Sequence, residues 1–462
     1  MRAGSQLFLH GFGQRYDLPI ALPVYLFAAA AVVVLSFLMV VLFAGERQGQ
    51  RAVSYPRREL RFLRGLPRLR AVRIASGTIG VLLLLAVVVC GWFGSPRAER
   101  NPAEYITWIY FWAGLVMFNG LVGPLWDALN PFRALDSALS AVLQRPSPTG
   151  VGPGPLSRAG VWPAVVLYFA FACVELASGY ANRPWLVATL AFVYTVFTLV
   201  GMRRFGRDAW LERFEFFTVL FSVIRRFAPL QVEGDRVYVR PWGVGLLEPW
   251  PAGWDRVVFP LLMLSTLAFD GILATPLWQD LSVALGPYWQ PFGQLGFFAL
   301  RTLGLVDLTL LFLAVFVAVM RLVLRLGAGH AEAMSTMTAF ALTLVPIAFV
   351  YNAAHNYGYL VVQSQALVPL LADPLGRGWN LLPTKGFQPS LLLANAALVW
   401  YVQVVLIVLG HVIAVYLAHL RASERFRSAQ RALLSQYPLL LLMVLYTMTS
   451  LWILAQPVTR QG

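Results

Sequence analysis

Residues 19–44 read PIALPVYLFAAAAVVVLSFLMVVLFA, an uninterrupted apolar run without a charged side chain. A helix of this length can cross the roughly 30 Å hydrocarbon core of a bilayer. The run is too long for a secretory signal peptide, and arginines follow it where a small-residue cleavage site would stand. We therefore expect a first membrane span here, and similar apolar runs recur along the chain.

The composition also points to a membrane protein. Of the 462 residues, 59% are hydrophobic and only 12% are charged, which is about half the charge of a soluble domain. The net charge of +15 does not indicate nucleic-acid binding, because the arginines sit in short loops instead of forming one basic face. Cys90 and Cys173 both lie in apolar runs, so no disulfide framework or cysteine-based zinc site is expected. These features predict an all-α, polytopic transmembrane helical bundle.

The distribution of arginine sets the orientation. Residues 46–73 contain nine arginines, and the positive-inside rule places this basic loop in the cytoplasm. The tail formed by residues 1–18 then lies outside. Following the apolar runs from there predicts about ten spans with both termini outside. The expected spans are 19–44, 75–94, 105–125, 161–179, 185–202, 257–276, 297–320, 337–356, 391–420 and 437–456. We expect them to form a single integral membrane domain over residues 1–462, in a bacterial inner (plasma) membrane.

Three segments between the spans are expected not to cross. Residues 126–159 combine an amphipathic helix with a Pro/Gly-rich linker on the cytoplasmic surface. Residues 203–256 form a cytoplasmic or interfacial segment, in which 210–228 is interfacial or re-entrant and 232–241 alternates like a β-hairpin. Residues 357–389 are too long for a tight loop and partly apolar, so we expect a re-entrant segment on the outer face.

Ionisable side chains inside spans are costly and usually face the interior of a bundle, so each is a candidate functional residue. The predicted topology gathers several of them in the outer half of the membrane, and the outward tail adds one more: His10, Glu175, Asp270, Arg301, Asp307 and His355. Carboxylates and imidazoles at one depth could hold a divalent metal, for which the predicted ligands are His10, His355, Asp270 and Glu175. Such a metal could lower the pKa of a bound water and so supply a hydroxide nucleophile.

The predicted catalytic residues are Asp270, Arg301 and Asp307, with Arg301 placed to stabilise developing negative charge. Two alternatives stay open. Arg301 could simply pair with Asp270 or Asp307 and neutralise buried charge. The carboxylates could instead line a proton or ion path.

His411 and His419 form a second constellation, as buried polar residues of the span 391–420. They lie eight residues apart, which is roughly 12 Å and 80° on a helix, so they cannot share one metal ion. Packing or hydrogen bonding, a proton relay and axial ligation of a haem are all open for His411. The haem alternative lacks a second inner-half histidine on another span.

Three stretches, taken together, resemble the bacterial membrane proteins called fenitrothion hydrolases. They are HGFGQRYDLP (10–19), GPLWDALNPFR (123–133) and a C-terminal block with AHNY (354–357), DPLGRGW (373–379) and GHVIAVYLAH (410–419). The resemblance extends over most of the chain, and the tail and residues 410–419 are its most specific parts. It implies hydrolysis of an organophosphorus triester to a nitrophenol and a dialkyl thiophosphate in a membrane. It supplies no catalytic motif, so no active-site residue is carried over from it.

The expected function is therefore a membrane-embedded hydrolase of organophosphorus triesters, with a divalent metal as the cofactor that its site could hold. The expected partners are the lipid bilayer and a hydrophobic small-molecule substrate, and a membrane partner subunit is compatible with the aromatic surface. One alternative is a transporter or permease-like protein that uses intramembrane carboxylates, for which Pro346 and Gly410 hint at broken helices. Another is a membrane subunit of a redox complex that uses His411.

Overall fold

The computed structural model describes residues 16–43, 55–148, 158–327, 332–384, 386–390, 392, 395–426 and 428–460. Nearly all of their regular structure is helical, which confirms the predicted all-α class. Where the sequence suggests one domain, the chain forms two compact units. The first unit combines residues 1–54, 243–361 and 391–462, and the second combines residues 55–242 and 362–390.

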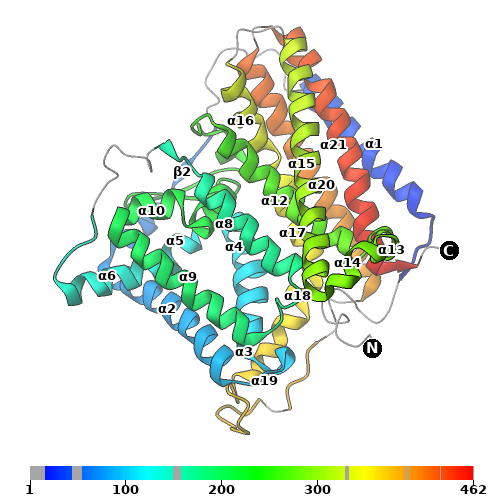
Figure 1. Cartoon of the computed structure of the whole chain (residues 1–462). Coiled ribbons are helices and arrows are strands. Elements are labelled where there is room, and N and C mark those ends of the chain that lie inside the picture. The colour runs from blue at the N-terminus through cyan, green and yellow to red at the C-terminus, as the bar shows by residue number, and fades with distance from the viewer. Residues whose placement is uncertain are drawn as a thin grey trace. The chain divides into compact units, whose positions relative to one another are not determined.

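The first unit is a bundle of long helices. Its main members are α1 (Leu22–Phe43), α12 (Trp254–Leu273), α15 (Gly293–Gly327), α16 (Ala333–Thr343), α17 (Val345–His355), α20 (Ala396–Arg425) and α21 (Ala429–Val458). Shorter elements complete it: β1 (Tyr16–Asp17), η7 (Val244–Leu247), α13 (Pro276–Ala284), α14 (Gly286–Trp289), η8 (Gln290–Phe292), α18 (Tyr357–Val361) and β5 (Thr459–Arg460). Helix α20 packs against α17 and α21, and α1 packs against both α20 and α21 although it lies far from them in sequence (Figure 1). Strands β1 and β5 pair in parallel.

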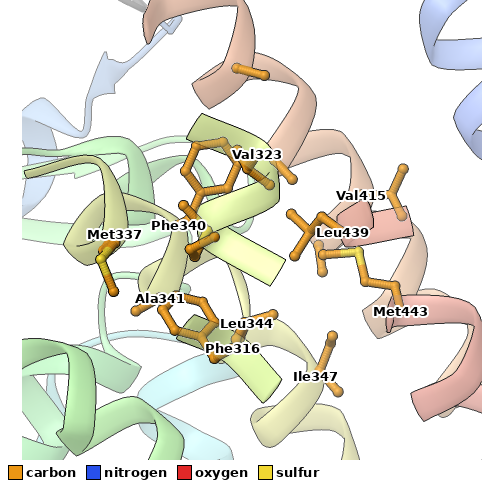
Figure 2. Packing of buried hydrophobic residues seen from close by; sticks show 14 of the residues in the cluster. Phe316, Val323, Met337, Phe340, Ala341, Leu344, Ile347, Val415, Leu439 and Met443 are labelled. Atoms are coloured by element: carbon orange, nitrogen blue, oxygen red, sulfur yellow. The ribbon is translucent and has the colours of Figure 1, made fainter. Parts of the chain in front are cut away.

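An apolar cluster holds the first unit together. Figure 2 shows part of it, to which Phe316 from α15, Phe340 from α16 and Met443 from α21 contribute. Helices α17 and α20 approach closely because Gly410 has no side chain: a Cβ there would lie 2.1 Å from Cγ2 of Val350. This close approach holds the middle of α17 against α20.

The span predicted at 337–356 is broken in its middle. Helix α16 ends at Thr343 and α17 begins at Val345, with Pro346 in its first turn. Proline has no amide hydrogen to donate and is tolerated in the first turn of a helix, so Pro346 explains a new helix start here. The other hint of a break is wrong, because α20 continues through Gly410.

The second unit contains shorter and less regular helices. They are α2 (Arg70–Phe93), η4 (Ala98–Arg100), α3 (Pro102–Glu104), η5 (Tyr105–Leu115), α4 (Val116–Leu121), α5 (Leu125–Leu129), α6 (Pro131–Leu143), α8 (Trp162–Ala172), η6 (Cys173–Ala177), α9 (Pro184–Phe205), α10 (Arg207–Arg213) and α11 (Phe216–Ile224). Short 3-10 turns η2 (Arg61–Leu63), η3 (Leu66–Arg68) and η9 (Gln363–Ala366) and helix α19 (Leu367–Leu370) also belong to it. Within 210–228, most residues of α11 are buried inside the protein.

A small antiparallel sheet confirms the hairpin predicted at 232–241. Strands β3 (Leu230–Glu233) and β4 (Arg236–Val239) pair directly, and β2 (Arg58–Glu59) joins the other edge of β4. Val239 pairs with Leu230 on one side and with Arg58 on the other. The arginine-rich stretch 46–73 thus contributes a strand that sequence patterning does not predict.

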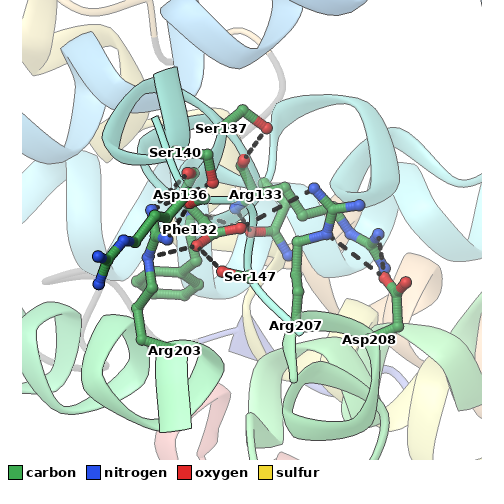
Figure 3. A network of polar contacts seen from close by, with 11 residues as sticks. Phe132, Arg133, Asp136, Ser137, Ser140, Ser147, Arg203, Arg207 and Asp208 are labelled. Carbon is green, nitrogen blue, oxygen red and sulfur yellow. Dashed lines mark hydrogen bonds and ion pairs between the residues drawn. The ribbon is translucent and has the colours of Figure 1, made fainter. Parts of the chain in front are cut away.

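Charged side chains tie α6 to the helices that follow it in the second unit (Figure 3). Asp136 on α6 is fully buried and lies 3.3 Å from Nε of Arg203 and 3.9 Å from Nη1 of Arg207. Arg133, one turn earlier on α6, lies 3.2 Å from Oδ1 of Asp208. The surface position predicted for this helix stays a prediction, but Asp136 itself is buried and is neutralised by two arginines.

Eight helices of the described residues are long and apolar enough to cross a membrane, which supports a multi-pass membrane protein. Six belong to the first unit and two, α2 and α9, to the second. Two of the expected spans are not among them. Residues 105–121 form a π-helix followed by α4, and residues 162–177 form a short α-helix that ends in a π-turn. Neither is one continuous α-helix of spanning length.

Candidate functional site

Asp270 and His355 form the centre of the candidate site. Asp270 lies in the last turn of α12, and His355 is the last residue of α17. Nε2 of His355 lies 2.9 Å from Oδ2 of Asp270, and the imidazole is only 5% exposed. Tyr351, one turn before His355, lies with its ring nearly parallel to the imidazole at a centroid distance of 6.0 Å. The two residues that sequence analysis places at one depth are therefore in direct contact.

Arg301 adds a positive charge from a third helix. Its guanidinium carbon lies 4.2 Å from the centre of the Phe297 ring, one turn earlier on α15. The side chain is half-buried and interacts electrostatically with Asp270. The structure thus brings Asp270 and His355 into direct contact, with the guanidinium of Arg301 within electrostatic range of Asp270.

The polar residues around this group fix the end of α17. Asn352 is buried, and its side-chain oxygen accepts a hydrogen bond of 2.9 Å from Nδ2 of Asn356. Gln403 on α20 donates a hydrogen bond of 3.1 Å to the carbonyl oxygen of Ala354. These contacts hold the backbone on both sides of His355, so the imidazole is presented by a fixed helix end.

Asp307 does not join this group. It lies six residues after Arg301 on α15, about 9 Å along the axis and about 240° around it, so the two side chains leave different faces of the helix. Its side chain is exposed, among exposed leucines at 303, 310 and 311. The position of Asp307, exposed and on a different face of α15 from Arg301, therefore does not support its predicted catalytic role.

Two of the four predicted metal ligands meet in the described part of the chain. His355 and Asp270 are in contact, whereas Glu175 lies in η6 of the second unit and His10 lies outside the described residues. No group of three or more His, Cys, Asp or Glu side chains suited to a metal ion occurs among the described residues. The metal-binding set stays a prediction, and the chemistry below uses Asp270, Arg301 and His355 alone.

His411 is fully buried in the first unit. Its Nδ1 lies 2.8 Å from the carbonyl oxygen of Ile407, and its ring lies 5.9 Å from that of Tyr446 on α21. His419, near the other end of α20, contacts the side-chain oxygen of Gln436 at 3.0 Å. The two histidines therefore have separate environments, as their spacing predicts.

Sequence analysis misses three residues near the site: Tyr351, Tyr446 and Ser450. Tyr351 and Ser450 are buried and Tyr446 is partly buried in the first unit, and their hydroxyl oxygens have no hydrogen-bond partner in the described part of the chain. Hydroxyls and phenols are common in membrane helices, so their presence alone draws no attention. The available signal is that Tyr351 precedes His355 by one helical turn, a spacing at which side chains meet.

Besides Asp136, the second unit holds two buried carboxylates that the sequence does not single out. Glu215 caps the start of α11: its carboxylate accepts hydrogen bonds from the amides of Phe217 and Thr218 and from the hydroxyl of Tyr194. These three hydrogen bonds satisfy the carboxylate, which therefore serves as the N-terminal cap of α11. Glu104, in the turn before the predicted span 105–125, is less well satisfied, because one of its oxygens is buried without a partner in the described chain. Burial raises the pKa of Glu104 to about 8, and a hydrogen bond with Trp108 opposes that shift.

Comparisons with protein-family models, with curated proteins and with solved structures each gave no match.

Proposed function

We propose that the chain is a membrane-embedded hydrolase of hydrophobic esters, with Asp270, His355 and Arg301 as its catalytic group. The observation that carries this proposal is the 2.9 Å contact between Nε2 of His355 and Oδ2 of Asp270 beside the guanidinium of Arg301. The resemblance noted in the sequence suggests organophosphorus triesters as the substrate class. Such compounds partition into lipid, so a site in the bundle of a bacterial inner-membrane protein can take them from the bilayer.

The three groups match the needs of hydrolysis at phosphorus. His355 accepts a proton from water while the water oxygen bonds to phosphorus, and Asp270 stabilises the imidazolium that forms. The bond from phosphorus to the aryl oxygen breaks, and the nitrophenolate leaves with that bonding pair. Arg301 stabilises the negative charge that develops on the oxygen or sulfur of the phosphoryl group.

Release of nitrophenol from fenitrothion by the detergent-purified protein tests this proposal. We expect Asp270→Asn and His355→Gln each to lower turnover by about 100-fold, since acid–base groups typically contribute 10²–10⁴-fold. Asp280→Asn, on the exposed face of α13 in the same unit, is the matched control and should retain the wild-type rate. Wild-type rates in both site variants would contradict the assignment. Assays with a chelator and with added divalent metals test the metal-assisted version.

A second candidate function is transport. The observation that favours it is the break between α16 and α17 at Leu344, because discontinuous spans often form the binding sites of transporters. In this case Asp270 and His355 bind and release protons, and no bond in the cargo breaks. Fenitrothion accumulation in proteoliposomes that depends on an imposed pH gradient would favour transport, because a hydrolase needs no gradient.

A further inference from the structure

A line of polar side chains, three of them buried and one partly buried, leads away from Asp270 and His355 through the first unit. Its members are Tyr351 on α17, Ser450 and Tyr446 on α21, and His411 on α20. Tyr351 and Ser450 are each 1% exposed and His411 is 0% exposed. In each of the four, a polar side-chain atom is buried without a hydrogen-bond partner in the described part of the chain. Such atoms cost about 1–3 kcal/mol each, so four in one bundle require an explanation.

The pairing of the helices orders these residues. Helices α17 and α20 run in opposite directions, because Ala354 contacts Gln403 while Val350 lies against Gly410. Tyr351 lies within electrostatic reach of both Asp270 and Tyr446. Tyr446 in turn faces His411, which is eight residues and about 12 Å along α20 from Gln403. The order from the site inward is therefore Tyr351, then Tyr446 with Ser450, then His411.

The atoms along this line can both donate and accept protons. The carbonyl oxygen of Ile407 can only accept a hydrogen bond, so Nδ1 of neutral His411 carries the hydrogen and Nε2 is left as an acceptor. The hydroxyls of Tyr446 and Ser450, one turn apart on α21, lie close together but are not aligned as a hydrogen bond. Water between these groups would satisfy all of them, because a water molecule can donate to Nε2 and accept from a hydroxyl.

We propose that Tyr351, Tyr446, Ser450 and His411 hold a chain of water molecules that carries protons between the Asp270–His355 pair and the level of His411. This inference rests on the proposed function, because the Asp270–His355 pair is one end of the path. Hydrolysis of a triester at a buried site produces one acid group per turnover, and the proton that His355 accepts must leave the bundle. The path supplies this exit. In the transport alternative, the same path couples transport to a pH gradient.

Hydroxyl-radical footprinting of the wild-type protein, with radicals generated from bound water by a millisecond X-ray pulse, tests the water. Tyr168 of the second unit is the matched control, since it is a buried tyrosine, 3% exposed, stacked on Phe216. We expect Tyr351 and Tyr446 to be hydroxylated at least tenfold faster than Tyr168. Equal protection of the three tyrosines would overturn the proposal. The experiment needs no substrate, so it can fail while hydrolysis is confirmed, or the reverse.

Proton entry into proteoliposomes tests the transfer step. A potassium gradient with valinomycin drives protons inward, and a pH-sensitive dye inside the vesicles reports them. We expect wild-type protein to exceed empty vesicles, Tyr446→Phe to reduce the added flux at least fivefold, and Tyr437→Phe, on an exposed position of the same helix, to match the wild type. Flux equal to empty vesicles, or a Tyr446→Phe variant that conducts like the wild type, would overturn the path even if water is present.

Discussion

Nε2 of His355 lies 2.9 Å from Oδ2 of Asp270, so the last residue of α17 meets a carboxylate in the last turn of α12. Arg301 of α15 acts on the same carboxylate. The contact joins α12 to α17, and the electrostatic interaction links both to α15, because removal of one charge leaves its partner uncompensated. The arrangement therefore has consequences for stability that are separate from any catalytic role.

The first prediction concerns the coupling between Asp270 and Arg301. Asp270→Asn and Arg301→Gln should each destabilise the protein by about 1–3 kcal/mol, because each leaves the opposite charge without compensation. The double variant should lose less than the sum of the two, as residues in one network do. Denaturant titration followed by tryptophan fluorescence measures these values. Asp270→Asn combined with Asp307→Asn should be additive, since Asp307 leaves α15 on another face, and coupling of equal size in that control pair would refute the prediction.

The second prediction concerns the close approach of α12 and α17. A Cβ on Gly271 would lie 2.2 Å from Oη of Tyr351 and 2.5 Å from Cγ2 of Ile453. Gly271→Ala should therefore destabilise the protein by about 1–3 kcal/mol through overpacking. Tyr351→Phe removes the nearer atom and should recover part of that loss, whereas Tyr446→Phe should recover none. Thermal unfolding of Gly271→Ala alone and combined with either tyrosine substitution decides this, and a Gly271→Ala protein as stable as the wild type would show that the helices are farther apart.

The third prediction concerns Asp136 in the second unit. Its carboxylate accepts a hydrogen bond from Ser147 and neutralises Arg203 and Arg207 (Figure 3). Asp136→Asn keeps the shape but removes the charge, so a loss on the order of 3 kcal/mol is expected. Asp208→Asn is the control, because Asp208 is about half exposed and exposed ion pairs contribute little. Similar losses in both variants, measured by thermal unfolding, would mean that burial does not set the energy of this network.

The fourth prediction concerns the pH dependence of stability. Burial raises the pKa of Glu104 to about 8, above the ordinary value of 4.5. The folded protein thus binds this proton more tightly than the unfolded chain does. The stability that the group contributes is fully present below pH 4.5 and is lost as the pH rises through about 8. The melting temperature of Glu104→Gln should fall less than that of the wild type between pH 5 and pH 8. Glu99→Gln should behave as the wild type. If the melting temperatures of all three proteins change with pH in parallel, Glu104 is not the cause of the pH dependence.

Sequence patterning predicts the long helices of the first unit well, because an unbroken apolar run of spanning length has few other structures open to it. The span expected at 391–420, for example, is α20 (Ala396–Arg425), which continues past the apolar run into its arginines. The spans expected at 105–125 and 161–179 stay predictions, because the hydrophobicity there is equally high but the hydrogen-bond pattern changes to a π-helix. Hydropathy reports the environment of side chains and carries no information about that pattern.

The candidate site was predictable only in part, for a related reason. The cost of ionisable groups in lipid marks Asp270, Arg301 and His355, and the structure brings these three together. Depth in the membrane does not say which helices are neighbours, so Glu175 and Asp307 were grouped with them although one lies in the second unit and the other on an outer face. Tyr351 and Tyr446 carry no such cost in a sequence, and only the packing of α17 against α20 and α21 reveals them.

The pairing of α1 with α20 and α21 also fixes an order of biogenesis. About 350 residues separate α1 from α20, which is roughly 20–70 s of synthesis at typical rates. During that time α1 has left the ribosome without its partners, while the residues of the second unit from 55 to 242 are already made. The first unit is therefore completed only when α20 and α21 have been made. A nascent chain interrupted before α20 leaves α1 in the bilayer without its partner helices and exposed to membrane proteases.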